Sequence, residues 1–224
     1  MVELPSPNHG PRPADRPIDM LVIHYTGMRA AMAAVDRLCD PRSQVSAHYL
    51  IEETGRIWHL VREERRAWHA GVAFWAGERD VNSLSIGIEL ANPGHEFGYR
   101  AFPPAQMSAL AELAKDVVER YEIPPHRVLG HSDVAVGRKI DPGELFDWEQ
   151  LARIGVGLWP GRVEADGTEV DVAAFRRDLT RYGYDGQARE AVEAFQRHYR
   201  PWRVDGAVDA ECTAILAALL GEMS

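Results

Sequence analysis

Three apolar segments upstream of residue 150 have the patterns of buried strands. Met20–Ile23 and Val128–Leu129 are continuous apolar runs bounded by turn residues, which favours strands inside a core. Leu84–Leu90 instead carries leucine or isoleucine at every second position. Because side chains alternate between the two faces of a strand, this segment predicts a strand that points Glu89 away from its apolar side chains.

The segments between these strands have helical or hairpin patterns. Apolar residues three and four apart predict helices over Ala30–Cys39, from Pro103 to about Tyr121, and over Phe146–Ile154. Ala47–Glu52 and Arg56–Val61 flank a Glu-Thr-Gly turn and predict a β-hairpin. Strands that alternate with helices predict an α/β fold with a mixed central sheet flanked by helices. Ligands in such folds gather at the ends of the strands.

Both ends of the chain depart from this pattern. Residues 1–17 are rich in proline and charge and predict an irregular arm. Glycines and a proline predict a linker over residues 159–169, between a large domain over 1–158 and a small module over 170–224. The module has the spacing of three short amphipathic helices, with Asp209 as the N-cap of the last one. The fold class therefore includes a small C-terminal three-helix bundle.

The composition is that of a globular protein, since 46% of the 224 residues are hydrophobic. A net charge of −9 argues against a nucleic-acid partner, because such proteins concentrate positive charge on one face. Residues 1–8 lack the basic and apolar regions of a signal peptide, and no apolar run has the length of a membrane span. The expectation is a monomeric cytoplasmic protein. The alternative is a periplasmic or cell-envelope location, if an export signal has been removed.

Two of the predicted strands lead into histidines, and a nearby loop adds a carboxylate. His24 follows Met20–Ile23, His131 follows the second apolar run, and Asp141 lies in the glycine-containing loop after it. Zinc held by three protein ligands, with one position open, is the arrangement of catalytic zinc sites. Lys139 precedes Asp141 by two residues and would place a fixed cation beside such a metal.

Several motifs, in this order along the chain, resemble the zinc-dependent N-acetylmuramoyl-L-alanine amidases of the type 2, AmpD-like family. The motifs are Ile23-His24-Tyr25-Thr26, Ser46-Ala47-His48-Tyr49-Leu50-Ile51, Trp68-His69-Ala70-Gly71, Asn82–Leu90 and Gly130–Gly143. Each motif is weak evidence by itself, but the ordered set along residues 15–150 is specific. The resemblance implies hydrolysis of the amide between the lactyl group of N-acetylmuramic, or 1,6-anhydro-muramic, acid and L-alanine in peptidoglycan or muropeptides.

The resemblance also implies roles for individual residues. His24, His131 and Asp141 would bind Zn²⁺. Glu89 would be the general base, which takes a proton from water and passes it to the leaving nitrogen, and Lys139 would stabilise the oxyanion. Some family members have a tyrosine where this chain has Ala47, which favours a carboxylate for proton transfer here.

Residues outside this catalytic set receive less specific roles. Trp68 and His69 are expected to line the substrate groove, and Asn82 either to contact substrate or to brace a loop. Asp133 is expected to cap or brace its own loop. A serine-hydrolase triad made of His131, Ser132 and Asp133 is excluded, because such triads are assembled from distant segments.

The C-terminal module resembles the three-helix peptidoglycan-binding module found beside many wall hydrolases. The matching residues are Leu179…Gly183-Tyr184, Ala191-Val192…Phe195-Gln196 and Val204-Asp205-Gly206…Asp209. Such a module could act as a tether that raises the effective concentration on a polymer. It could instead dock on the catalytic domain and shape its groove. Both alternatives are open from the sequence.

Two rival functions share the resemblance. One is a non-catalytic peptidoglycan recognition protein, which has the same fold but lacks a metal ligand. The other is a zinc amidase that acts on another substrate. The intact set of His24, His131 and Asp141, together with Glu89 and Lys139, favours the enzyme over the binding protein. Soluble anhydro-muropeptides and intact wall are both open as substrates.

Overall fold

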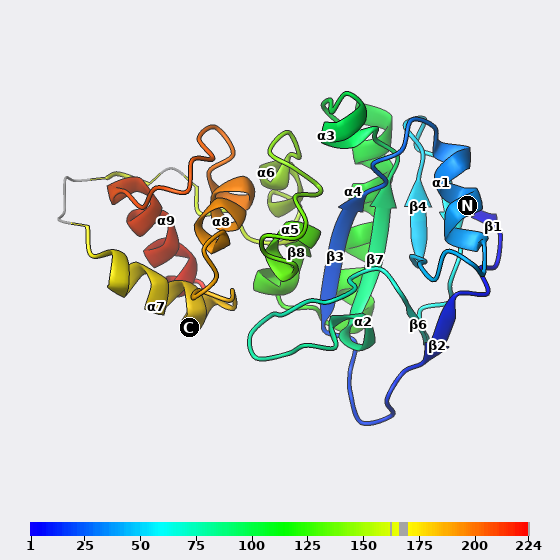
Figure 1. The fold of residues 1–224 in the computed structure, drawn as a ribbon, viewed down its shortest axis with the longest axis horizontal. Coiled ribbons are helices and arrows are strands. Elements are labelled where there is room, and N and C mark those ends of the chain that lie inside the picture. The colour runs from blue at the N-terminus through cyan, green and yellow to red at the C-terminus, as the bar shows by residue number, and fades with distance from the viewer. Residues whose placement is uncertain (162, 166–169, 224) are drawn as a thin grey trace.

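The computed structural model describes residues 1–161, 163–165 and 170–223. Its strands in the main sheet are β1 (Val2–Glu3), β3 (Met20–Tyr25), β4 (Tyr49–Ile51), β5 (Ile57–His59), β7 (Ser85–Leu90) and β8 (Val128–Gly130). Within the described residues these form one six-stranded sheet in the order β1-β5-β4-β7-β3-β8 (Figure 1). Strands β4, β7, β3 and β8 are parallel, and β4 and β5 form the predicted antiparallel hairpin. The predicted mixed sheet flanked by helices is confirmed.

The two central strands divide their side chains between the two faces of the sheet. Leu21 and Ile23 of β3 pack in one core cluster with the apolar stripe of α4 (Pro104–Tyr121). Because successive side chains alternate, His24 lies on the opposite face. Its register partner on β7 is Glu89, which lies on that same face. The sheet therefore places these two candidate residues side by side.

The remaining helices of the α/β part are short. They are α1 (Ala31–Cys39), α2 (Val81–Leu84), α3 (Gly94–Phe97), η1 (Pro125–Arg127), α5 (His131–Val134) and α6 (Trp148–Ala152). The predictions for α1 and α4 are confirmed. The closing helix over Phe146–Ile154 is wrong at its start, because Asp147 caps α6 by accepting a hydrogen bond from the Gln150 backbone at 2.9 Å.

The prediction of an irregular N-terminal arm is wrong in part. β1 pairs in parallel with β5, and β2 (His9–Pro11) pairs antiparallel with β6 (Arg65–Ala67). These pairings join backbone groups of strands only two or three residues long. Such strands are too short to show an alternation of apolar and polar side chains in the sequence. The arm is also fixed by the Ser6 hydroxyl, which donates to the carbonyl of Leu38 at 2.6 Å.

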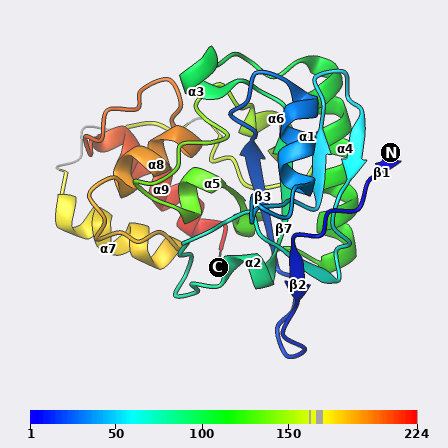
Figure 2. The same cartoon turned by 45° about the vertical axis from the view of Figure 1, so that its right-hand side comes forward.

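The C-terminal segment contains the three predicted helices, α7 (Val172–Tyr182), α8 (Ala191–Tyr199) and α9 (Ala210–Gly221). They lie at one end of the molecule, beyond α5 and α6 (Figures 1 and 2). Asp209 caps α9 as predicted, because its Oδ1 accepts from the Cys212 backbone at 2.9 Å. Residues 162 and 166–169 of the predicted linker lie outside the described residues, and the domain division at 159–169 stays a prediction.

The bundle and the α/β part share one hydrophobic core. Its buried members from the α/β part are Met20, Val22, Ala70, Ala73, Trp75, Val81, Leu84, Leu129 and Val134. Its members from the bundle include Phe175, Leu179, Tyr182, Tyr184, Val192, Phe195, Ile215 and Leu219. The indole of Trp75 meets the rings of Tyr182 and Tyr184 edge-on, at centroid distances of 6.0 and 4.8 Å. The structure therefore has the bundle docked, which is the second of the two arrangements left open by the sequence.

No helix in the described part of the chain is both long enough and apolar enough to span a bilayer.

The shared core predicts that the α/β part is unstable alone. A chain that ends at Gly161 would expose the apolar face that the bundle covers. We expect its melting temperature to fall by at least about 10 °C, since each kcal/mol lost lowers it by roughly 2–4 °C in a chain of this size. Thermal unfolding followed by circular dichroism, with binding of a hydrophobic dye as a second readout, tests this. An unchanged melting temperature without dye binding would contradict it.

Candidate metal centre and active site

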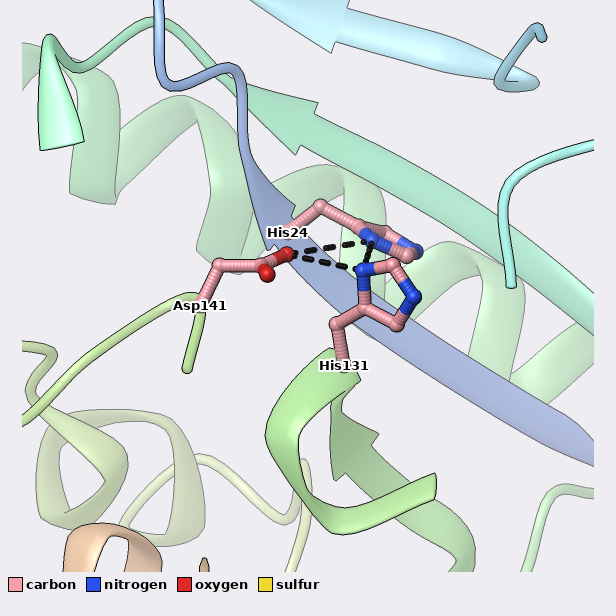
Figure 3. A group of neighbouring side chains, drawn as sticks. All are labelled: His24, His131 and Asp141. Carbon is pink, nitrogen blue, oxygen red and sulfur yellow. Dashed lines mark hydrogen bonds and ion pairs between the residues drawn. The ribbon is translucent and has the colours of Figure 1, made fainter. Parts of the chain in front are cut away.

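Three buried side chains converge beside the C-terminal end of β3 (Figure 3). Nδ1 of His24 lies 2.9 Å from Nδ1 of His131. Oδ2 of Asp141 lies 3.0 Å from Nδ1 of His131 and 3.3 Å from Nδ1 of His24. Ligand atoms held tetrahedrally at the usual zinc distances are about 3.3 Å apart. The three atoms thus have nearly the spacing of one face of a zinc coordination tetrahedron.

The protonation chemistry of this group also suits a cation. Burial, and after it the neighbouring His131, lower the pKa of His24 to about 4, so its ring is neutral at pH 7 and carries one free lone pair. Burial alone would raise the pKa of Asp141, but the two histidines lower it below its usual range. Two imidazole lone pairs and a carboxylate are ligands that zinc prefers.

The loop that carries two of these residues is closed by backbone contacts. The Ser132 backbone donates to the carbonyl of Asp141 at 2.8 Å, which holds the end of the loop against the start of α5. Gly130, where β8 meets α5, has no room for a side chain, because a Cβ there would lie 2.9 Å from Pro142. His131 and Asp141 therefore meet because the chain turns tightly at Gly130 and returns.

Asp133 braces this turn, as the sequence analysis expected. Its Oδ2 accepts from the Gly130 backbone at 2.6 Å and from Nδ1 of His198 at 2.7 Å. Its Oδ1 accepts from the hydroxyl of Tyr184 at 2.7 Å. Two of the three partners belong to the C-terminal segment. The docked bundle therefore contacts the metal-ligand loop directly, and His198, to which the sequence analysis gave no role, is one of the contacts.

The backbone carbonyl of Ala70 fixes the orientation of His131. It lies 3.1 Å from Nε2 of His131 and can only accept, so it favours a ring proton on Nε2 and a free lone pair on Nδ1. In the metal-free protein the carboxylate of Asp141, 3.0 Å from Nδ1, favours the opposite tautomer. Arg138 donates to the same carbonyl and to that of Val72. Sequence reasoning missed Arg138, although it stands in the same loop motif as Lys139.

A cavity of about 340 Å³ is lined in part by two of the three candidate ligands, His131 and Asp141. Glu89 lies in its wall, and Oε2 of its carboxylate has no hydrogen-bond partner among the described residues. Burial, and after it the charge of Asp141, raise the pKa of Glu89 to about 8, while Lys139 opposes the shift. An unpartnered carboxylate beside a metal centre can exchange a proton with a bound molecule.

The cavity wall contains most of the other predicted site residues. Lys139 is exposed at its rim and Trp68 is partly buried in its wall. His69 also contributes to the wall, but its Nδ1 lies 3.0 Å from Nε2 of His24 and its Nε2 lies 3.2 Å from Oγ of Ser85. Both ring nitrogens of His69 therefore already have partners inside the protein.

Asn82 has the contacts of the second of its two expected roles. It is not part of the cavity wall. Its Oδ1 accepts from the backbone N–H groups of His69 and Ala70, at 3.0 and 2.8 Å. The Asn82 side chain therefore braces the backbone of His69 and Ala70. The ring of His69 contacts His24, and the carbonyl of Ala70 contacts His131.

Comparisons with known proteins show the family of the chain. The model of the N-acetylmuramoyl-L-alanine amidase family matches residues 14–144. The chain is 43% identical over 232 residues to N-acetylmuramoyl-L-alanine amidase AmiD of Escherichia coli, a match that covers 91% of this chain and 82% of that protein. It is 37% identical over 166 residues to 1,6-anhydro-N-acetylmuramyl-L-alanine amidase AmpD of Haemophilus influenzae, which covers 66% of this chain and 88% of that protein.

Two similar solved structures contain muropeptide compounds. One is E. coli AmiD in complex with the substrate anhydro-N-acetylmuramic acid-L-Ala-D-γ-Glu-L-Lys, with a TM-score of 0.83, 42% identity, and coverage of 93% of this chain and 91% of that one. The other is AmpDh3 of Pseudomonas aeruginosa in complex with anhydromuramic pentapeptide, with a TM-score of 0.76, 36% identity, and coverage of 92% of each chain.

The raised pKa of Glu89 predicts a pH-dependent stability of the metal-free protein. Folding raises this pKa from 4.5 to about 8, so between these values the folded state holds a proton that the unfolded state has lost. Stability therefore falls as the pH rises through this window. We expect Glu89→Gln to be more stable than the wild type at pH 8, by about 2 kcal/mol, because one pKa unit corresponds to about 1.4 kcal/mol and the carboxylate keeps part of its hydration.

Urea denaturation between pH 4 and pH 8, in the presence of a chelator, measures this difference, which should vanish near pH 4. Glu96→Gln is the matched control, because Glu96 is an exposed carboxylate on the same cavity. Equal stabilities of Glu89→Gln and the wild type at pH 8 would contradict the prediction.

Proposed function

The chain belongs to the N-acetylmuramoyl-L-alanine amidase family, and we propose that it hydrolyses the lactyl–L-alanine amide of muropeptides with one zinc ion held by His24, His131 and Asp141. The activity of an N-acetylmuramoyl-L-alanine amidase follows from the family and from the similarity to AmiD and AmpD. The observation that carries the zinc proposal is the buried triangle of two Nδ1 atoms and one Oδ2 atom.

The residues around the triangle suggest how the reaction is divided. A zinc ion bound there would polarise a carbonyl oxygen and lower the pKa of water to about 7. Glu89 would take the proton of the attacking water and return it to the leaving nitrogen. A nearby dication favours the ionised form of a carboxylate, so zinc bound there would lower the pKa of Glu89 back toward its usual range. Lys139 at the rim would stabilise the oxyanion, and Trp68 would orient the substrate from the wall.

The rival functions are less well supported. A non-catalytic recognition protein has no need of an unpartnered carboxylate beside an intact set of ligand atoms. For the substrate, two similar structures contain anhydromuramyl peptides. We therefore place soluble 1,6-anhydro-muropeptides first among the substrates, ahead of an unrelated amide.

The activity is tested with a defined anhydro-muropeptide and mass spectrometry of its products. We expect free stem peptide and intact anhydro-muramyl sugar from the zinc-loaded protein. Glu89→Gln and Lys139→Ala should each lower kcat by about a hundredfold or more, the usual scale for an acid–base or oxyanion group, while zinc content stays at one per chain. Glu96→Gln again serves as the control. Cleavage at another bond, or unchanged turnover in either variant, would remove the corresponding part of the proposal.

The docked bundle is proposed to bind peptidoglycan in a fixed orientation beside the cavity. Support comes from its sequence resemblance to wall-binding modules and from an exposed tryptophan of the bundle that faces Trp159 of the α/β part. Trp202 is 62% exposed and meets Trp159 edge-on, at a centroid distance of 6.5 Å. Tryptophan is enriched at contact sites, because its ring has a large apolar face and its N–H can donate a hydrogen bond.

This proposal predicts the effect of removing one exposed side chain. Trp202→Ala should lower cosedimentation with isolated sacculi severalfold, because the ring projects into solvent and its loss leaves the core intact. Val172→Ala is the matched control, since Val172 is an exposed apolar residue of the same bundle. Melting temperature and turnover of the soluble muropeptide report whether each variant is folded. Wild-type cosedimentation by Trp202→Ala would exclude this surface as the wall contact.

The cytoplasmic location and the monomeric state inferred from the sequence stay predictions. Cell fractionation and light scattering after size-exclusion chromatography test them.

A further inference from the structure

We propose that His69 is a positioning residue, which holds His24 in the tautomer that binds metal, and that Ser85 fixes the direction of this contact. The inference rests on the proposed zinc site. It changes the role of His69 from a substrate contact to a partner of a ligand. One line of buried donors and acceptors supports this role, from His24 through His69 and Ser85 to the carbonyl of Val81.

A neutral imidazole carries one proton on its two nitrogens. Nδ1 of His24 lies in the triangle, 2.9 Å from His131 and 3.3 Å from Asp141. Its Nε2 lies 3.0 Å from Nδ1 of His69. If the proton is on Nε2, it is donated to His69, and the lone pair of Nδ1 is free for a metal. If the proton is on Nδ1, it is donated to the carboxylate of Asp141, and the lone pair needed for the metal is lost.

His69 can accept this proton only if its own proton is on the other nitrogen. That nitrogen, Nε2, lies 3.2 Å from Oγ of Ser85. The hydroxyl of Ser85 in turn lies 2.6 Å from the carbonyl of Val81. A carbonyl can only accept, so the hydroxyl donates to it and offers its lone pair to Nε2–H of His69. Along this line, the carbonyl of Val81 therefore determines the direction of each hydrogen bond, from Ser85 through His69 to His24.

The packing around His69 keeps this line in place. Ser85 is fully buried, His24 is 1% exposed and His69 is 8% exposed. Gly87, two residues along β7 from Ser85, leaves room for the ring, because a Cβ there would lie 2.5 Å from it. Asn82 holds the His69 backbone from the other side. The ring therefore has little freedom to turn away from His24.

The same short segment also sets the second histidine ligand. Asn82 accepts from the backbone N–H groups of both His69 and Ala70. The side chain of the first reaches His24, and the carbonyl of the second reaches His131. One braced dipeptide thus supplies an acceptor to Nε2 of both candidate imidazole ligands. The partner of His131 is a carbonyl, which can only accept a hydrogen bond. The partner of His24 is His69, which could donate or accept, and its contact with Ser85 sets the direction.

The test compares two replacements of His69 in the full-length protein. In His69→Gln, the amide oxygen can still accept from Nε2–H of His24. In His69→Leu, no acceptor remains. We expect the zinc dissociation constant, measured by competition with a chelating dye, to rise about 10- to 100-fold in His69→Leu, the usual effect of losing a partner of a metal-binding histidine. It should stay within a few-fold of wild type in His69→Gln. Ser85→Ala should lie between them.

His48→Gln is the matched control for loss of a buried histidine. Its ring lies 5.7 Å from that of His69, but its Nδ1 accepts from the Gly87 backbone. Its Nε2 lies 2.9 Å from the guanidinium of Arg12 and 3.1 Å from the carbonyl of Arg65, so the partners of both ring nitrogens lie outside the candidate ligand set. Zinc affinity should therefore be unchanged in this variant. Equal zinc affinities of His69→Leu and the wild type, in folded protein, would overturn the inference.

A second readout needs no metal. Long-range ¹H–¹⁵N spectra of the zinc-free protein report which nitrogen of His24 carries the proton. Without zinc, the carboxylate of Asp141, 3.3 Å from Nδ1 of His24, competes for the ring proton, so the variants are compared with one another. We expect a larger Nε2–H population in the wild type and in His69→Gln than in His69→Leu and Ser85→Ala. Equal populations in the wild type and His69→Leu would overturn the inference. Failure of the proposed zinc site looks different, because the His131→Ala variant would then keep the zinc affinity of the wild type while the tautomer result stands by itself.

Discussion

Three electron-pair donors that would otherwise avoid one another lie within 3.3 Å in a buried site. Two imidazole nitrogens at 2.9 Å gain nothing from each other unless a proton or a cation lies between them. Acceptors at His69 and at the Ala70 carbonyl face the Nε2 atoms of His24 and His131, which favours free lone pairs on both Nδ1 atoms. The sheet also positions the proposed general base, since register pairing places Glu89 beside His24.

The C-terminal bundle contributes to this arrangement through the loop that carries the ligands. Tyr184 and His198 both donate to Asp133, whose carboxylate also holds the Gly130 backbone at the turn before His131. The ring of His198 is in addition stacked on Trp148 of α6, at a centroid distance of 3.8 Å. A module that shares a core with the catalytic part and touches its ligand loop cannot behave as a freely tethered anchor. Any wall binding by the bundle would therefore occur at a fixed orientation to the cavity.

The sequence predicted those features that depend on local patterns or on a family resemblance. Helical periods located α1 and α4, and strand alternation placed Glu89 on the face away from α4. The capping role of Asp133 is also local, because its partner Gly130 is three residues away. The contact of Asp133 with Tyr184 joins positions 51 residues apart, and the contact of His24 with His69 joins positions 45 apart. Such contacts depend on how the elements pack, which no spacing in the sequence encodes.

The central claim is that both histidines bind one zinc ion through Nδ1, together with Asp141. Anomalous diffraction at the zinc absorption edge, from crystals of the zinc-loaded protein, tests it most directly. We expect one peak, about 2.0–2.2 Å from Nδ1 of His24, Nδ1 of His131 and one carboxylate oxygen of Asp141, with Nε2 of His24 still directed at His69. A peak elsewhere, or coordination of either histidine through Nε2, would contradict it.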